Sequence, residues 1–191
     1  MANQSTTGFG LRPIRKVGQN DDNAGLAEWK KAASTTAIDH HDLTLLAATG
    51  YVTVATAGIG VLNAVGSLNG SFYTDPTTNK PTWSNWAPNN AATDHTCLIN
   101  DDPKQMFEMR TALTSLTQAD AGATAPIVDS AGSGAPNYIS GFTIGAVTTA
   151  LNQVKLLGIT RDTLNQDVSA AGSVWRVMIC SHILGNNIAG I

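Results

Sequence analysis

The stretch Tyr51-Val52-Thr53-Val54-Ala55-Thr56 decides the fold class of this chain, because apolar and polar side chains alternate along it. Such alternation is typical of a half-buried strand, with Val52 and Val54 on one face and Thr53 on the other. An apolar run over residues 42–46 precedes it, and a turn near Gly50 joins the two. We therefore predict two neighbouring strands of a meander.

Strand patterns continue on both sides of this stretch. Residues 59–65 and 71–74 are predicted strands, separated by Gly66 and by Asn69-Gly70, a strong hairpin signal. Residues 97–100 begin another strand pair, turned at Asp101-Asp102-Pro103. The last strand candidates are 138–147, 153–159 and 173–183, the final one with Trp175, Val177 and Ile179 on one face and Arg176 on the other.

Other segments are predicted as helix or loop, or leave the choice open. Residues 24–33 favour a short helix by propensity. Residues 105–111 alternate like a strand, but Asp102 as N-cap and Pro103 at the first helical position also suit a helix over 103–118. Residues 75–90 and 117–137 are typical of loops, the second with at most one short strand near Ile127.

These patterns predict a mainly-β fold, a β-sandwich or barrel of about eight to ten short strands with an extended N-terminal arm. We divide the chain into the arm, residues 1–23, and a β-domain, residues 24–191. A disordered terminus is the alternative for the arm, but its apolar residues favour ordering on a neighbouring subunit, with its cations facing an acidic strip. The apolar residues are Phe9, Leu11, Ile14 and Val17, and the cations are Arg12, Arg15 and Lys16.

The composition excludes several classes of protein. A formal net charge of -3 argues against nucleic acid as the main partner, and a hydrophobic content of 42% argues against a disordered chain. Charged residues make up 13%, whereas about a quarter is usual for a soluble domain, so we expect much of the surface to face other protein. We find no signal peptide and no membrane span, and expect Cys97 and Cys180 to be buried thiols.

A search for catalytic and metal-binding residues gives one weak cluster, His40-His41-Asp42. Adjacent residues on a strand point to opposite faces, so we do not expect His40 and His41 to share a metal ion. We also find no nucleophile-elbow, phosphate-loop or dinucleotide-binding motif. The sequence thus predicts no enzyme, no cofactor and no metal, with a hydrolase that uses His41 and Asp42 as a weaker hypothesis.

Apolar residues in a loop and in the C-terminal tail are candidates for protein contacts. Trp83 and Trp86 lie three residues apart in the predicted loop 75–90, where they either cap the core of their own domain or pack on a neighbouring chain. Ile188 and Ile191 would be unusually exposed on a monomer. We therefore predict a protein interface formed by Phe9, Leu11, Arg12, Ile14, Arg15, Lys16, Trp83, Trp86, Ile188 and Ile191.

Several motifs together resemble the capsid cement (decoration) proteins of tailed bacteriophages, especially podovirus-like phages of cyanobacteria and other aquatic bacteria. They are Gly8-Phe9-Gly10-Leu11-Arg12-Pro13, Phe72-Tyr73-Thr74-Asp75, Lys80-Pro81-Thr82-Trp83-Ser84, and Asp101-Asp102-Pro103 before Met106-Phe107-Glu108. The resemblance implies a strand after Pro103 and a mainly-β virion protein. It also implies a homotrimer, bound to the outside of the capsid, that locks subunits of the major capsid protein together without contacting nucleic acid or membrane.

The tryptophans leave a second function open. A carbohydrate- or receptor-binding β-module of a virion fibre would use Trp83 and Trp86 as a stacking platform.

Overall fold

A computed structural model describes residues 3–17, 25–56, 63–130, 132–165 and 167–185. A five-stranded antiparallel sheet has the order β1 (Arg12–Lys16), β8 (Gln105–Arg110), β13 (Val174–Ile179), β12 (Val154–Ile159) and β9 (Thr124–Ala125). A six-stranded antiparallel sheet has the order β2 (Ala27–Lys30), β7 (Thr96–Asn100), β5 (Ala64–Thr74), β3 (Leu43–Leu46) and β4 (Val52–Val54), with β6 (Pro81–Ser84) also paired to β5. β10 (Ile127–Val128) pairs with β11 (Thr143–Ile144), and a 3-10 turn covers Gln118–Asp120.

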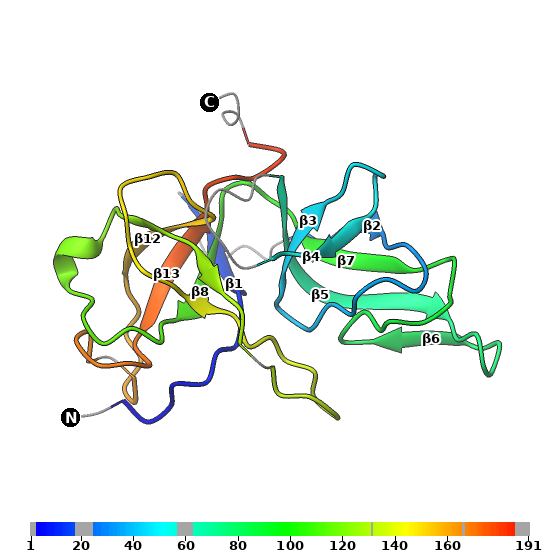
Figure 1. The fold of residues 1–191 in the computed structure, drawn as a ribbon, viewed down its shortest axis with the longest axis horizontal. Coiled ribbons are helices and arrows are strands. Elements are labelled where there is room, and N and C mark those ends of the chain that lie inside the picture. Colours follow the sequence, from blue (N-terminus) through cyan, green and yellow to red (C-terminus); the bar gives the residue numbers. More distant parts are fainter. Residues whose placement is uncertain (1–2, 18–24, 57–62, 131, 166, 186–191) are drawn as a thin grey trace.

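The two large sheets lie side by side along the long axis of the molecule (Figure 1). Each has its own apolar core. The larger core lies beneath the five-stranded sheet, around Phe107 and Trp175, and reaches Leu43 and Ala64 of the six-stranded sheet. The smaller core lies beneath the six-stranded sheet and includes Leu68, Cys97 and Ile99, with Ile38 and Ala87 from loops. The predicted mainly-β class is confirmed.

The ambiguous segment after Pro103 is a strand. β8 pairs with β1 on one side and with β13 on the other, and it places Phe107 and Met109 in the larger core. Alternate residues Glu108 and Arg110 stay half-buried on the opposite face. The choice is physical, because only an extended backbone satisfies hydrogen bonds to two neighbouring strands at once. The helix suggested by Asp102 and Pro103 is wrong.

The helix predicted for residues 24–33 is also wrong, since Ala27–Lys30 is strand β2. β2 pairs antiparallel with β7, so that Trp29 lies opposite Cys97 and Lys30 opposite Thr96. Glu28 and Lys30 are exposed, while Trp29 packs against the smaller core. Pairing along a free sheet edge outweighs a weak helix propensity in so short a segment.

The hairpin predicted at Asn69-Gly70 is absent from the described chain, because β5 runs straight through both residues. The register between β5 and β7 shifts between Leu68 and Gly70, so the pair marks a bulge in a long strand. Gly70 has φ +156°, a backbone angle that residues with a side chain rarely adopt. A Cβ at this position would lie 2.6 Å from the Trp83 ring. Gly70, which the sequence pattern assigns to a turn, instead allows the Trp83 ring of β6 to lie close to the backbone of β5.

Two loop predictions also change. The loop over 75–90 contains strand β6, which pairs with the end of β5. Residues 101–103 do not join a strand pair, since β7 belongs to the six-stranded sheet and β8 to the five-stranded sheet. This turn instead carries the chain from one sheet to the other.

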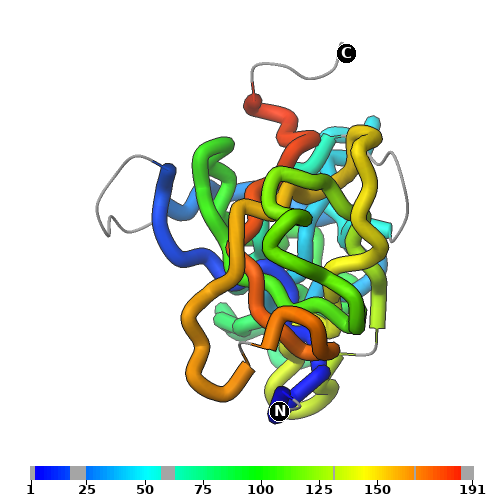
Figure 2. Tube along the Cα trace, turned by 90° about the vertical axis from the view of Figure 1, so that its left-hand side faces the viewer, coloured from blue at the N-terminus to red at the C-terminus, as the bar shows by residue number. Residues whose placement is uncertain are grey.

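The N-terminal segment packs on its own chain. β1 is the edge strand of the five-stranded sheet, and Leu11 is fully buried in the larger core. Upstream, the Asn3 side-chain amide donates to the carbonyl oxygens of Asp167, Ala170 and Ala171. Figure 2 shows this blue segment at the same end of the molecule as the orange loop that holds it. The predicted ordering on a neighbouring subunit is thus replaced, for residues 3–17, by pairing within the chain.

Within the described ranges, no helix has the length and apolarity needed to cross a membrane.

Candidate interaction surfaces

The outer side of the six-stranded sheet carries an exposed aromatic pair. The register places Lys30, Thr96, Phe72 and Trp83 opposite one another in a row across β2, β7, β5 and β6. Phe72 is 48% exposed and Trp83 is 53% exposed. The next row brings half-buried Leu98 beside Gly70. We call the surface formed by Phe72, Trp83 and Leu98 the aromatic face.

The tryptophan of the aromatic face is held by its own sheet. Because Gly70 has no side chain, the Trp83 ring lies directly over the backbone of β5. Cross-strand pairing sets Phe72 beside it. The pair forms an exposed apolar surface, in which the Trp83 ring packs on Gly70 and both rings are about half exposed.

Trp86 does not belong to this face. Its ring stacks on Tyr138 with centroids 3.8 Å apart and an interplanar angle of 10°. Its carbonyl oxygen accepts a hydrogen bond from the Ser71 hydroxyl on the inner side of β5. Trp86 therefore packs on Tyr138 within the chain and stays half-buried, whereas the Trp83 ring is exposed.

The predicted N-terminal interface residues separate into buried and accessible ones. Leu11 is fully buried and is therefore withdrawn from the interface, while Phe9, Ile14 and Lys16 are half-buried. Arg12 and Arg15 are exposed.

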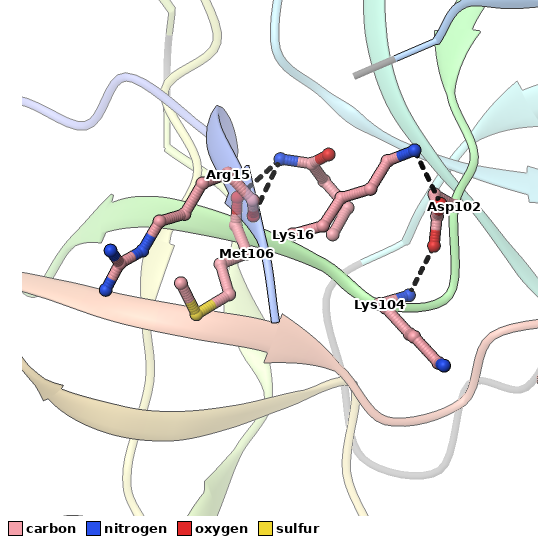
Figure 3. Close-up of polar contacts among 6 residues, drawn as sticks. Arg15, Lys16, Asp102, Lys104 and Met106 are labelled. Carbon is pink, nitrogen blue, oxygen red and sulfur yellow. Dashed lines mark hydrogen bonds and ion pairs between the residues drawn. The ribbon is translucent and has the colours of Figure 1, made fainter. Parts of the chain in front are cut away.

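Two of the predicted cations already have acidic partners within the chain. Arg12 forms an ion pair with Glu108 of β8, and Lys16 Nζ lies 3.0 Å from Asp102 Oδ2. Figure 3 shows Lys16 directed toward Asp102, while Arg15 lies beside Met106 on the sheet. Ile188 and Ile191 lie outside the described residues.

The His40-His41-Asp42 cluster differs from the strand geometry assumed in the sequence analysis. His41 adopts φ +70°, and the two imidazole rings lie on the same side with centroids 3.9 Å apart. Burial, the neighbouring His40 and the Arg12 charge lower the pKa of His41 to about 3, although a hydrogen bond to the Phe9 backbone opposes the shift. The expectation that the two histidines point apart is wrong, and His41 is neutral at physiological pH.

Asp42 is buried next to a cavity of about 220 Å³ that Asp39 and Asp129 also line. Burial raises the pKa of Asp42 to about 7, and the negative charges of Asp39 and Asp129 act in the same direction. Hydrogen bonds from the Ser140 side chain and the Asp39 backbone lower this pKa, but by less. Asp42 Oδ2 accepts the Asp39 N–H at 2.7 Å. The Asp42 carboxyl group is thus hydrogen-bonded to Asp39 and Ser140, so His41 and Asp42 are not arranged as a catalytic pair.

A buried polar cluster beneath the six-stranded sheet escaped the sequence analysis. The Lys31 side chain is 1% exposed, and its Nζ donates to the carbonyl oxygens of Thr35 and Pro88 at 3.3 and 3.1 Å. Burial lowers the pKa of Lys31 and raises that of the nearby Cys97 thiol to about 12. Fully buried His95 packs edge-on against Tyr73. Cys97 is a buried thiol, as predicted, and Cys180 is half-buried.

Within the described ranges, no group of three or more His, Cys, Asp or Glu side chains is placed to hold a metal ion.

Comparison of the chain with known proteins finds no matching family model, no matching curated protein and no matching solved structure. The function is therefore argued from the residues and surfaces of this chain.

Proposed function

We propose that the protein is a structural virion protein of the cement type, which binds the outside of a phage capsid and locks subunits of the major capsid protein together. The aromatic face is the observation that supports this most directly. Phe72 and Trp83 are each about half exposed and lie opposite each other on the paired strands β5 and β6. Aromatic residues are enriched at the centres of protein interfaces, and Trp and Tyr among their energetic hot spots.

The geometry of the face also favours protein contact. The Trp83 ring packs over Gly70, and the backbone of Phe72 is paired on both sides of β5, so a partner would cover a tryptophan ring that is already in place. Binding then costs little side-chain entropy, which increases the net free energy gained per contact. Because a shell repeats the contact many times, modest individual affinities suffice for stable attachment.

The low content of charged residues supports the same proposal. Charged residues make up 13% of the chain, about half the share usual for a soluble domain, which favours contact of its surface with other protein. The resemblance of the sequence to cement proteins further implies that the protein forms a homotrimer and lies on the capsid exterior. It also implies that the protein has no direct contact with nucleic acid or membrane. Under this proposal the protein is not an enzyme and uses no cofactor.

The test is the amount of this protein in purified phage particles. We expect stoichiometric incorporation, near one copy per major capsid subunit, in tailed particles and in tailless heads alike. Quantitative mass spectrometry of both preparations measures it. Absence from the particles, a trace amount, or loss with the tails would overturn the proposal.

Substitution of the aromatic face tests how the protein attaches. Particles assembled without this protein are mixed with the wild-type chain, with Trp83→Ala or with the control Tyr51→Ala, which removes another exposed aromatic ring at the turn before β4. We expect Trp83→Ala to weaken binding by about tenfold or more, since a central aromatic residue often contributes more than 1 kcal/mol. Tyr51→Ala should bind like the wild type. Equal binding by all three chains would exclude the aromatic face as the contact.

A carbohydrate- or receptor-binding module of a virion fibre is the second candidate, and the open ring of Trp83 over a flat strand favours it. Sugar rings stack on such a surface through their apolar side. Glycan binding that Trp83→Ala abolishes, while the variant still attaches to particles at the wild-type level, would support this candidate over the first.

A further inference from the structure

The outer side of the five-stranded sheet gathers basic residues into two rows. One row runs Arg12, Glu108 and Arg176 across β1, β8 and β13. The other runs Arg15, Met106, Met178 and Lys155 across β1, β8, β13 and β12, with a cation at each end and two methionines between them. Arg110 lies two residues beyond Glu108 on the same side of β8. We call the surface formed by Arg12, Arg15, Arg110, Lys155 and Arg176 the arginine face.

The charge of this face is opposite to that of the chain. It holds five of the 11 Lys and Arg residues, including four of the five arginines, although the chain has a net charge of -3. Glu108 is the one acidic residue in the two rows. Among the described residues, Arg15, Lys155 and Arg176 form no ion pair, so most of the positive charge is not neutralised within the described chain.

Some of the guanidinium groups are held in place before any partner binds. Those of Arg12 and Arg110 both lie over the Phe9 ring, each 4.9 Å from its centroid. Arg110 also donates to the Ser5 hydroxyl at 3.1 Å and to the Thr7 carbonyl oxygen at 2.6 Å. The N-terminal segment thus orders one edge of the face, which reduces the entropy lost on binding.

In the second row, Arg15 and Lys155 are exposed at the two ends, with buried Met106 and half-buried Met178 between them. Figure 3 shows Arg15 extended along the sheet beside Met106. Arginine and methionine are both enriched in protein interfaces, where arginine can bind a carboxylate through two parallel hydrogen bonds. A surface with cations around Glu108 and half-buried Met178 suits a protein partner better than a phosphate backbone, which would meet that carboxylate and that apolar side chain without compensation.

We propose that the arginine face docks on an acidic protein surface, with carboxylates of the partner between Arg15, Lys155 and Arg176. Placing that acidic surface on the capsid shell rests on the proposed function. The aromatic face, on the other sheet, is then a separate contact. Since the attraction is between charges, docking should weaken as the salt concentration rises.

The test uses the full chain, with Arg15→Glu/Lys155→Glu as the variant. Both side chains are exposed, so we expect the double variant to fold with an unchanged thermal midpoint. Lys80→Glu is the control, because it reverses an exposed lysine at the start of β6, outside the arginine face. Binding is measured on particles assembled without this protein, on poly-L-glutamate and on a double-stranded DNA oligonucleotide, each at low and at physiological salt.

We expect the wild type and Lys80→Glu to bind particles and poly-L-glutamate, and the double variant to bind both at least about tenfold more weakly. A second outcome is that the wild type binds poly-L-glutamate but no particles, and that the double variant binds poly-L-glutamate more weakly. The proposed function then fails, while an acidic protein partner is supported. If the double variant binds particles like the wild type, this inference fails and the proposed function stands. A further outcome is that the wild type and Lys80→Glu bind DNA strongly, that the double variant does not, and that all three bind particles equally. The arginine face would then be a nucleic-acid site, and the inference would be overturned.

Discussion

Substitution of Asp42 by asparagine should make the protein more stable at neutral and alkaline pH. In the folded chain the pKa of Asp42 is raised from 3.8 to about 7, mainly because its carboxyl group is buried and the residue is only 6% exposed. Between these two values the folded state keeps a proton that the unfolded chain releases. The contribution of Asp42 to the free energy of unfolding therefore falls as the pH rises from about 4 to about 7, and this penalty is complete above pH 7.

The size of the effect follows from the shift. A raised pKa of about three units corresponds to roughly 4 kcal/mol at 1.36 kcal/mol per unit. The amide introduced by Asp42→Asn would keep an oxygen to accept the Asp39 N–H, but it fits the Ser140 hydrogen bond less well. We therefore expect Asp42→Asn to be more stable than the wild type by about 2 to 4 kcal/mol at pH 8 and nearly equal to it at pH 4.

His41 acts in the opposite direction. Its pKa is lowered to about 3 in the folded chain, so the unfolded chain binds the extra proton below about pH 6.5 and stability rises with pH in that window. In the wild type the two residues largely cancel between about pH 4 and 6.5. Asp42→Asn should leave a rising slope there. His41→Asn, chosen because asparagine tolerates the positive φ of His41, should make the slope less positive than that of the wild type, while buried His95, with its pKa lowered to about 4, still contributes a rise.

Urea unfolding followed by tryptophan fluorescence at pH 4.5, 6 and 8 measures these slopes. Glu28→Gln makes the same change in charge at an exposed position of β2 and is the control. The reasoning is refuted if Asp42→Asn is no more stable than the wild type at pH 8, or if its profile is parallel to that of the wild type across the whole range.

Three further predictions concern the core and the thiols. Leu11→Ala should destabilise the protein by about 3 kcal/mol in urea unfolding, because Leu11 is fully buried in the larger core; a change below about 1 kcal/mol would show that the N-terminal segment is dispensable for folding. Gly66→Ala should cost more than about 2 kcal/mol, since the new Cβ would lie 2.0 Å from the Asn100 carbonyl oxygen at φ +158°, and wild-type thermal stability would contradict this close approach. In a Cys180→Ser variant, which removes the half-buried thiol, Cys97, buried and with its pKa raised to about 12, should react with Ellman's reagent at pH 8 only as fast as the protein unfolds; rapid modification of this variant in the folded state would refute the burial of Cys97.

Alternation along the chain was a reliable guide where both faces of a strand differ. Residues 52–54 and 174–179 form strands as predicted, because their apolar residues fill one side and the pattern has a period of two. The exposure of Trp83 also agrees with the predicted interface, although the partner of that surface stays a prediction. Burial of Cys97 follows from the usual preference of a free thiol.

Local patterns misled where distant pairing decides the conformation. Residues 27–30 favour a helix by propensity, yet they complete the free edge of β7. Asn69-Gly70 has the composition of a turn, yet its glycine makes room for the Trp83 ring. The conformation of each segment depends on pairing with a strand far away in the sequence, and the residues of a short segment alone do not show that pairing.

The sequence by itself determined the mainly-β class, the low surface charge and most of the strand positions, since these depend on composition and on periodicity within a few residues. Only the tertiary structure decided the place of the N-terminal segment and the surfaces that remain open. Leu11 and Trp83 are both apolar residues beside turn-forming ones, yet one is buried beneath a sheet and the other exposed on top of one. The arginine face likewise exists only because the antiparallel register brings basic residues of β1, β12 and β13 to one side of the same sheet. These residues are Arg12, Arg15, Lys155 and Arg176. Charges so far apart in sequence come together only when the strands pair.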